Sequence, residues 1–273
     1  MILQALLINA MILVVMMLIL WRVAVKIDDV SFIDAVWGGG MVVMALISWV
    51  QLALSQGEGG GASALATVIL VMVAAWGIRL FGHLFTRWRL EGEDNRYHRI
   101  LKKDREAGNF ARAALIKVFG MQALLLFLVC LPAQLGILAS QQPQPLGMLG
   151  WTGLAVFVAG ISFEWAGDYQ LEKFKTDPAS KDQVLDTGLW RYTRHPNYFG
   201  DAVAWWGIWL AAASAGWEIA AWSVIGPIFL TFTLMKWSGG PLLERGMAKR
   251  RPEYGEYQRR TSAFFPLPPK SSG

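Results

Sequence analysis

Long apolar stretches alternate with short polar connections along this chain. Each stretch is near the roughly 20 residues with which an α-helix crosses the hydrocarbon core of a bilayer. The pattern predicts about seven membrane-spanning helices, at Leu3–Leu20, Phe32–Leu54, Ala64–Phe85, Ala113–Ala139, Leu146–Tyr169, Gly200–Ala213 and Trp217–Trp237. We expect the first to be a retained anchor, because no basic segment precedes it and no small-residue cleavage site follows it.

Composition supports this interpretation. Hydrophobic residues make up 55% of the 273 residues and charged residues only 16%, whereas a soluble domain carries about 25% charged residues. The balance excludes a soluble domain and a disordered chain, and the single cysteine, Cys130, excludes a disulfide scaffold or thiolate metal cluster. The expected fold class is all-α, a polytopic integral membrane protein forming one domain over residues 1–273.

The distribution of basic residues predicts the topology. The connections Gln51–Ser63, Ser140–Gly147 and Ala211–Glu218 contain none of the 25 lysines and arginines. Because basic loops stay in the cytoplasm, we expect the N-terminus outside and the C-terminus inside. Residues 238–273 then form a cytoplasmic amphipathic tail. The net charge of +5 reports this topology and does not indicate binding to nucleic acid.

Several ionisable residues fall inside the predicted spans or at their inner ends, where they are costly and mark functional sites by default. Arg79, His83 and Arg87 share one helix face, as do Glu164 and Asp168. A polar cavity open to the cytoplasm would satisfy these groups; the alternative is structural pairing or snorkelling near the interface. No metal is expected, because the histidines lack ligand spacing. The full set is Asp34, Arg79, His83, Glu164, Asp168, Asp201, Lys236 and Glu244.

A glycine-rich segment, Gly57 to Ala62, fits the G-x-G-x-x-A pattern of dinucleotide-binding proteins. That pattern carries meaning only between a strand and a helix of a βαβ unit. Here it follows a predicted span on the exterior side, so we interpret it as a turn.

The segment from Gly188 to Asp201 is more informative. Pro196 disfavours helix at His195 and suits the first turn of a new helix, so a helix is predicted to begin near Asn197. Backbone N–H groups at a helix start, with Arg191, Arg194 and His195, would form an anion site. The alternative is a loop that re-enters the membrane, with its arginines at lipid phosphates.

At this segment the chain resembles the steroid 5-alpha-reductase superfamily, in its bacterial branch. The resemblance covers most of the chain and rests on these elements: Asp34-x-x-Trp37-Gly38; Trp76-Gly-x-Arg79-Leu with His83 and Arg87; Glu93-Asp94-x-Arg96-Tyr97; Asp168-Tyr169 with Lys173 and Lys175; Arg194-His-Pro-Asn-Tyr-Phe-Gly-Asp201; and Leu243-Glu244 with Tyr254, Tyr257 and Pro266. It implies about seven transmembrane helices, location in the bacterial inner membrane, NADPH bound from the cytoplasmic side, and reduction of a 3-oxo-4-ene steroid or related enone.

The resemblance also implies residue roles. The segment Arg194–Asp201 is called the box below. Within it, Asn197 and Asp201 match cofactor-contacting residues of the family, although Asp replaces Glu at 201. The glutamine–glutamate pair with which the family contacts the steroid carbonyl is not visible in this sequence. The cofactor-binding candidates are Arg79, His83, Arg87, Arg96, Tyr97, Glu164, Asp168, Lys173, Lys175, Arg191, Arg194, His195, Asn197, Tyr198, Asp201, Glu244, Tyr254 and Tyr257.

For the chemistry, a donor must face the carbonyl oxygen where charge develops. Asp34, protonated by a low-dielectric setting, is the catalytic candidate, and a buried tyrosine or water is the alternative. Trp37 and Trp76 are the substrate-binding candidates for a lipophilic enone entering from the bilayer. The expected partners are this substrate and membrane lipid, and a monomer is the simplest assembly.

Two other functions remain open at this stage. The box is also similar to that of membrane methyltransferases, such as isoprenylcysteine carboxyl methyltransferase, which use S-adenosylmethionine. A lipid-binding or transport protein without chemistry is the third hypothesis. Basic residues near the box favour NADPH, whose 2′-phosphate requires arginine or lysine.

Overall fold

The computed structural model describes residues 1–56, 63–141, 145–181, 183–237, 244 and 253–270. Within these ranges the chain is helical, and its only extended pairing is an isolated parallel bridge between Thr193 and Ser262. The chain forms two compact units, one of Met1–Gly150 with Ala211–Gly226, the other of Trp151–Leu210 with Pro227–Gly273. Each is described by itself. The Gly57 to Ala62 pattern and Leu243 lie outside the described residues.

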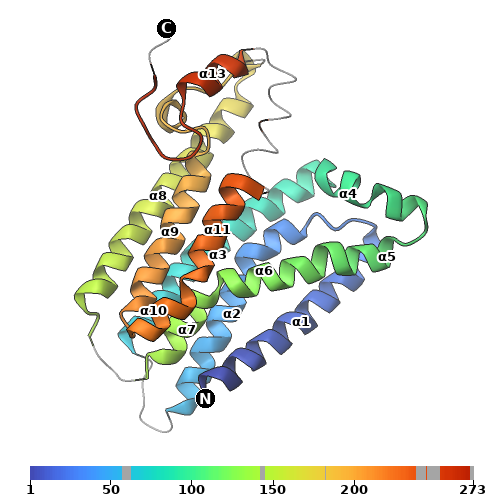
Figure 1. The fold of residues 1–273 in the computed structure, drawn as a ribbon. Coiled ribbons are helices and arrows are strands. Elements are labelled where there is room, and N and C mark those ends of the chain that lie inside the picture. The colour runs from blue at the N-terminus through green and yellow to red at the C-terminus, as the bar shows by residue number, and fades with distance from the viewer. Residues whose placement is uncertain (57–62, 142–144, 182, 238–243, 245–252, 271–273) are drawn as a thin grey trace. The chain divides into compact units, whose positions relative to one another are not determined.

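The first unit is built on helices α1, α2 and α3, drawn in blue to cyan in Figure 1. The amphipathic helix α4 and a further apolar segment follow, and α10 completes the unit. The bounds are α1 Ile2–Ile27, α2 Ile33–Ser55, α3 Ala64–Glu91, α4 Asn95–Glu106, α5 Phe110–Ala113, the π-helix η1 Ala114–Gly120, α6 Met121–Val129, α7 Leu131–Ala139 and α10 Trp217–Ser223.

Two glycines allow α2 and α3 to touch. A Cβ atom on Gly38 would lie 2.4 Å from the carbonyl oxygen of Gly77, and one on Gly77 would lie 2.5 Å from the carbonyl oxygen of Gly38. Small residues allow such close backbone approach between membrane helices. The glycines that follow Trp37 and Trp76 in the sequence motifs are therefore explained by helix packing.

The second unit centres on α8, Met148–Thr176, and α9, Pro196–Ala213, which lie side by side in Figure 1. A Cβ atom on Gly160 would lie 2.4 Å from the backbone nitrogen of Ala204, and one on Gly200 would lie 2.3 Å from that of Glu164. Gly200, the glycine of the box, is thus needed for the close packing of α8 and α9. The other elements are η2 Pro178–Ser180, η3 Gly188–Arg191, α11 Ile225–Phe232, η4 Thr233–Trp237 and α13 Tyr254–Arg260.

Six helical segments of the described chain are long and apolar enough to cross a membrane: Ile2–Ile27, Ile33–Ser55, Ala64–Glu91, Phe110–Val129, Met148–Thr176 and Trp217–Lys236. The all-helical class is confirmed for the described residues, and the six apolar helices support the membrane-protein prediction. The count of seven is not confirmed, because the predicted span Gly200–Ala213 lies in α9, which is helical but not among the six. The orientation of the termini stays a prediction.

The predicted span Ala113–Ala139 is not one continuous helix. A turn at Cys130 separates α6 from α7, and Pro132 occupies the first turn of α7. Proline has no N–H and clashes with the carbonyl four residues earlier, so it ends a helix and suits the start of the next. Pro132 is therefore the feature of the sequence that indicates the break between α6 and α7.

Candidate functional site

In the first unit, the Asp34 carboxylate gathers two residues from a distant helix. Arg96 Nη2 donates to Oδ2 of Asp34 at 2.5 Å, and the Tyr97 hydroxyl donates to Oδ1 at 2.7 Å. Asp34 lies in the first turn of α2, whereas Arg96 and Tyr97 lie in the first turn of α4. Sequence reasoning assigned Asp34 to the substrate and the other two residues to the cofactor, but in the structure they form one cluster.

Both oxygens of Asp34 act as acceptors in this cluster. A protonated carboxyl group would place its own hydrogen on one oxygen, yet here both oxygens accept, one of them from a guanidinium. The structure therefore differs from the expectation that a protonated Asp34 acts as a donor. The donors of this cluster are Tyr97 and Arg96.

The local sequence explains why α4 presents this pair. Asp94 is the N-cap of α4 and accepts from the backbone N–H of Arg96 at 2.8 Å, a standard stabilisation of a helix start. Its carboxylate also holds the Arg96 guanidinium, with Nε to Oδ1 at 3.1 Å and Nη2 to Oδ2 at 2.9 Å. Glu93 pairs with Arg105 at 2.7 Å. The acidic residues of the Glu93–Tyr97 motif thus fix α4 in place.

Burial and charge determine the protonation of the pair. Burial raises the pKa of Tyr97 well above its usual value, and the neighbouring Asp34 raises it further. Burial opposes the charged form of Arg96, but Asp34 and Asp94 outweigh it and raise the pKa of the guanidinium. At neutral pH the phenol therefore keeps its hydrogen and the guanidinium keeps its charge.

The two tryptophans expected at the substrate differ in environment. The indole N–H of Trp37 donates to Oε1 of Gln122, whose Nε2 donates to the Tyr97 oxygen at 3.2 Å. Trp37 is thus linked to the Asp34 cluster. Trp76 is only 1% exposed and lies in the core of the unit. It has no exposed ring face in this structure. Hydropathy alone does not distinguish a core tryptophan such as Trp76 from one that lines a cavity, so the sequence could not predict this.

The three basic positions predicted on one face, Arg79, His83 and Arg87, do lie on a single helix, α3, and each is partly exposed. Elsewhere on α3, three aromatic residues form a ladder. Phe81 stacks on Phe85 with centroids 5.4 Å apart, and Phe85 contacts Trp88 at 5.4 Å. Phe81 and Phe85 are 38% and 39% exposed, so α3 carries an aromatic stripe that periodicity in charge did not reveal.

In the second unit, the start of α9 meets α8 through polar side chains. Asn197 Nδ2 donates to Oδ1 of Asp168 at 2.9 Å, and the Tyr198 backbone N–H donates to the side-chain Oδ1 of Asn197 at 3.1 Å. Glu164, one turn before Asp168, is 3% exposed. The structure therefore brings together Asn197 and Asp168, two of the cofactor candidates. Asp201 lies one turn further along α9 and is partly exposed.

Arg194 and His195 are held by the C-terminal segment. Glu244 Oε1 accepts from Arg194 Nε at 2.8 Å and from His195 Nε2 at 2.9 Å. Arg194 Nη1 also donates to the carbonyl oxygens of Gln258 and Thr261, at 2.8 and 3.0 Å. Most of the Arg194 donors are thus engaged within the protein, unlike the expectation that Arg194 binds a phosphate.

The rest of the tail is docked around the same point. The Tyr257 hydroxyl donates to the Trp190 carbonyl at 2.6 Å, and Phe264 meets Phe199 of α9 at 5.8 Å between ring centroids. Tyr254 and Tyr257 are 5% and 3% exposed, so they support the fold of this unit. The exposed cations of the unit include Lys173, Lys175 and Arg191.

A second polar cluster was missed because its members carry no charge. Asn9 and Gln134 are fully buried, and Asn9 Nδ2 donates both to Ser48 Oγ and to Gln134 Oε1 at 2.8 Å. Gln51 Nε2 donates to Asn9 Oδ1 at 2.8 Å. Amides inside membrane helices hydrogen-bond across helices, so this network ties α1, α2 and α7. Glutamines and asparagine within apolar runs were the available signal.

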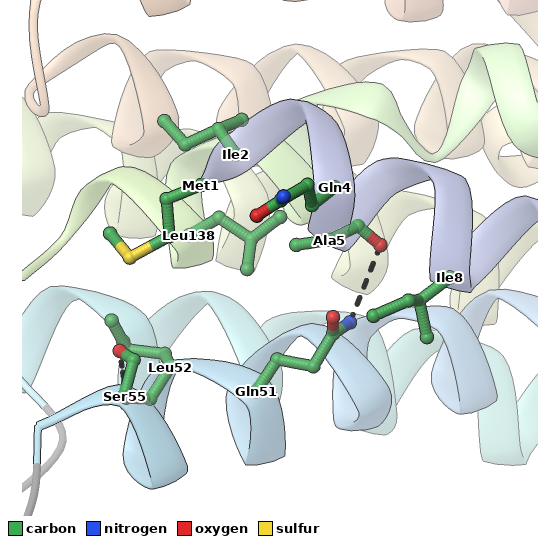
Figure 2. Close-up of a pocket in the computed structure, with 9 residues that line it drawn as sticks. All are labelled: Met1, Ile2, Gln4, Ala5, Ile8, Gln51, Leu52, Ser55 and Leu138. Carbon is green, nitrogen blue, oxygen red and sulfur yellow. Dashed lines mark hydrogen bonds between the residues drawn. The ribbon is translucent and has the colours of Figure 1, made fainter.

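A pocket of about 160 Å³ opens beside this network, between the beginning of α1 and the end of α2. Figure 2 shows Gln51, Leu52 and Ser55 on one side and the first residues of α1 on the other. Gln51 lies 17 residues after Asp34 on α2, a separation of about 25 Å along the helix. The pocket is therefore distinct from the Asp34 cluster. Within the described residues, no group of three or more His, Cys, Asp or Glu is arranged to hold a metal.

Comparison with known proteins gives a family and partial relatives. A family profile described as "Protein of unknown function (DUF1295)" matches residues 20–261. An uncharacterized protein of Schizosaccharomyces pombe is 27% identical over 168 residues, which are 53% of this chain and 46% of that protein. The proteins named 3-oxo-5-alpha-steroid 4-dehydrogenase 1 of Mus musculus and Rattus norvegicus are each 29% identical over 83 residues, 30% of this chain and 29% of theirs. The chain thus matches less than half the length of each relative. No solved structure matches the chain.

Proposed function

We propose that this chain, which belongs to the DUF1295 family, is a membrane-embedded, NADPH-dependent reductase of the steroid 5-alpha-reductase superfamily. Its substrates would be 3-oxo-4-ene steroids or similar lipophilic enones, reduced at the 4,5 double bond. The partial similarity to the two steroid dehydrogenases supports the class. The observation that carries the proposal is the convergence of Tyr97 and Arg96 on Asp34.

The donor set of the second unit fits a dinucleotide. The half-buried pair of Asn197 and Asp168 offers an amide and a carboxylate suited to hydroxyl or amide groups. Lys173, Lys175 and Arg191 are exposed and would neutralise phosphates. NADPH, when bound, supplies the hydride that the β-carbon of the enone receives. We further propose that the chain lies in a bacterial inner membrane with this site facing the cytoplasm.

The Asp34 cluster would perform the other half of the reaction. As hydride reaches the β-carbon, negative charge grows on the carbonyl oxygen, and a preorganised donor there lowers the barrier most. Tyr97 is the proposed donor, because its hydroxyl already donates to Asp34 and keeps its hydrogen at neutral pH. The phenol turns its hydrogen from Asp34 to the carbonyl oxygen, while Arg96 remains on Asp34. The phenol hydrogen-bonds the enolate oxygen but keeps its hydrogen, the α-carbon takes one proton from solvent as the carbonyl reforms, and the phenol then turns back to Asp34.

In this proposal Asp34 is the group that positions the donors. The carboxylate holds the phenol and the guanidinium at one point, and Asp94 holds the guanidinium from the other side. This division explains why Arg96 and Tyr97 lie in the first turn of a helix that Asp94 caps. The aromatic ladder of Phe81, Phe85 and Trp88, together with Trp37, offers apolar surface to a planar substrate.

One observation favours a second candidate, an S-adenosylmethionine-dependent methyltransferase. The preference for NADPH relied in part on Arg194, and that guanidinium is engaged by Glu244 and two backbone carbonyls. Asn197 and Asp168 would suit a ribose in either cofactor. Recognition of phosphate therefore distinguishes the two functions, because NADPH carries phosphate groups and S-adenosylmethionine does not.

The deciding experiment measures cofactor binding to the detergent-solubilised full chain. We expect NADPH to bind and S-adenosylmethionine not to bind, and we expect NADPH to be oxidised when a 3-oxo-4-ene steroid is added. Asn197→Ala and Asp201→Ala should each raise the dissociation constant for NADPH about tenfold or more, with yield and thermal stability near wild type. Binding of S-adenosylmethionine alone would establish the alternative, and loss of folding in both variants would favour a structural role for the box.

A further inference from the structure

One carboxylate connects the C-terminal segment to the two residues that precede α9. Glu244 Oε1 accepts from Arg194 Nε at 2.8 Å and from His195 Nε2 at 2.9 Å, and its Oε2 accepts from Gln258 Nε2 at 2.9 Å. All three partners lie in the second unit, and the side chains of Arg194, His195 and Glu244 are 13%, 10% and 15% exposed. Water therefore competes little for these hydrogen bonds.

The charge on Glu244 fixes which histidine nitrogen carries a hydrogen. Burial alone would raise the pKa of Glu244, but the hydrogen bonds from His195 and Arg194 outweigh it and lower the pKa to about 2. Glu244 is thus ionised at neutral pH. An ionised carboxylate only accepts hydrogen bonds, so Nε2 of His195 must be the donor.

Arg194 and His195 share one carboxylate oxygen of Glu244. Arg194 already balances the single negative charge of Glu244, and it reaches the same oxygen atom as His195. A second positive charge on the imidazole would face Arg194 at close range. Three neighbouring groups among the described residues are neutral: Tyr198 stacks on the ring at 5.3 Å between centroids, Gln258 donates to the far oxygen of Glu244, and burial raises the pKa of Tyr254 to about 12.

The other ring nitrogen then has a lone pair to offer. In a neutral imidazole with hydrogen on Nε2, Nδ1 is an acceptor. No hydrogen bond to Nδ1 of His195 occurs within the described part of the chain. His195 immediately precedes Pro196, the first residue of α9, and Asn197 with its Asp168 partner follows. His195 thus stands two residues before Asn197, at the start of the helix to which the cofactor is assigned.

We propose that Glu244 is a positioning residue that holds His195 as its Nε2–H tautomer, so that Nδ1 accepts a hydrogen bond from the cofactor. This inference rests on the proposed function. The chemical class that Nδ1 recognises is a neutral donor, a ribose hydroxyl or a carboxamide N–H, and not a phosphate. The start of the box is thus assigned to the uncharged parts of the dinucleotide, and its phosphates are assigned to the exposed Lys173, Lys175 and Arg191.

The tautomer is measurable without any cofactor. The chain has three histidines, His83, His98 and His195, so nitrogen-15 NMR of histidine-labelled full-length protein in micelles gives three sets of ring signals, and His195→Gln identifies one of them. We expect the His195 signals of the Nε2–H tautomer at neutral pH, and a mixture of tautomers in Glu244→Gln. An imidazolium or an Nδ1–H tautomer in the wild type would overturn the proposal.

A pair of substitutions then tests what Nδ1 does. Glutamine at 195 retains an amide donor near the position of Nε2 but has no acceptor at Nδ1. His195→Gln should therefore keep the melting temperature while raising the dissociation constant for NADPH about tenfold. His98→Gln, at an exposed position, is the matched control and should bind like wild type. Unchanged NADPH binding in His195→Gln would overturn the recognition by Nδ1. Absence of NADPH binding in the wild type would instead refute the reductase, while the tautomer measurement still decides the role of Glu244.

Discussion

Tyr97 donates its phenolic hydrogen to Asp34 across 2.7 Å, although 63 residues separate the two along the chain. A third residue, Arg96, reaches the other oxygen of the same carboxylate. The contact converts two predicted sites, one for substrate and one for cofactor, into a single cluster of donors held by one acceptor. It also moves the proposed catalytic hydrogen from a carboxyl group to a phenol.

The first prediction removes that phenol. Tyr97→Phe keeps the ring but deletes the donor, so single-turnover NADPH oxidation with a 3-oxo-4-ene steroid should fall about 10²–10³-fold, the usual loss for one donor to a developing oxyanion. The dissociation constant for NADPH should barely change. Tyr192→Phe, at an exposed position, is the control and should react at the wild-type rate.

Variants at Asp34 separate positioning from donation. Asp34→Asn keeps an oxygen that accepts from Tyr97, so it should retain more activity than Asp34→Ala, in which the phenol and guanidinium lose their common partner. Full activity in both Asp34→Ala and Tyr97→Phe would reduce the cluster to a clamp between α2 and α4.

A second prediction concerns the phosphates. Because Arg194 is engaged by Glu244, discrimination of NADPH from NADH should depend on the exposed cations. We expect a clear preference for NADPH, and we expect Arg191→Gln and Lys175→Gln each to reduce the ratio of the two dissociation constants. Lys181→Gln, an exposed lysine of the same connection, should leave the ratio unchanged. Equal affinities for both nucleotides in the wild type would contradict the argument from the 2′-phosphate.

Local features of the sequence predicted the local features of the structure. Apolar runs gave six of the expected spans, and Pro196 marked the start of α9 correctly, since it fits the first turn of a helix. Spacing also placed Arg79, His83 and Arg87 on one helix. These results follow from interactions within a few residues along the chain, which periodicity and proline chemistry describe directly.

Partners distant in sequence were beyond such reasoning. Asp34 meets Arg96 across 62 residues and Arg194 meets Glu244 across 50, and nothing in either segment specifies its partner. The arginine of the box carried the right charge for a phosphate, but a nearby carboxylate satisfied it first. The contact between Asn9 and Gln134 spans 125 residues and carries no charge, so neither periodicity nor charge indicates it.

A third prediction tests the helix crossing that places Asp34. Gly77→Ala adds a Cβ atom 2.5 Å from the Gly38 oxygen and 2.6 Å from Val42. Overpacking of this kind costs about 1–3 kcal/mol, more than the gain of up to about 1 kcal/mol from alanine in a helix. The melting temperature in detergent should therefore fall. Gly82→Ala, on the same helix with nothing within 4 Å of the added atom, should be neutral or stabilising, and an equal fall in both variants would contradict the close contact.

The last prediction uses the low pKa of Glu244 to test the docking of the tail. Hydrogen bonds from His195 and Arg194 lower that pKa from its usual 4.5 to about 2. A carboxyl group whose pKa is lower in the folded state stabilises the fold fully above the unfolded value and loses that contribution as the pH falls toward the folded value. The contribution of Glu244 should therefore be complete at pH 6 and lost progressively between about pH 4.5 and 2, where protonation leaves the buried Arg194 without its counter-charge. The measurement is the melting temperature of wild type and Glu244→Gln at pH 6 and at pH 3. Wild type should be the more stable at pH 6, and the gap should narrow at pH 3. Glu253→Gln, at an exposed position in the same tail, should follow the wild type at both pH values. A gap that stays constant with pH would mean that Glu244 does not hold the tail through its charge.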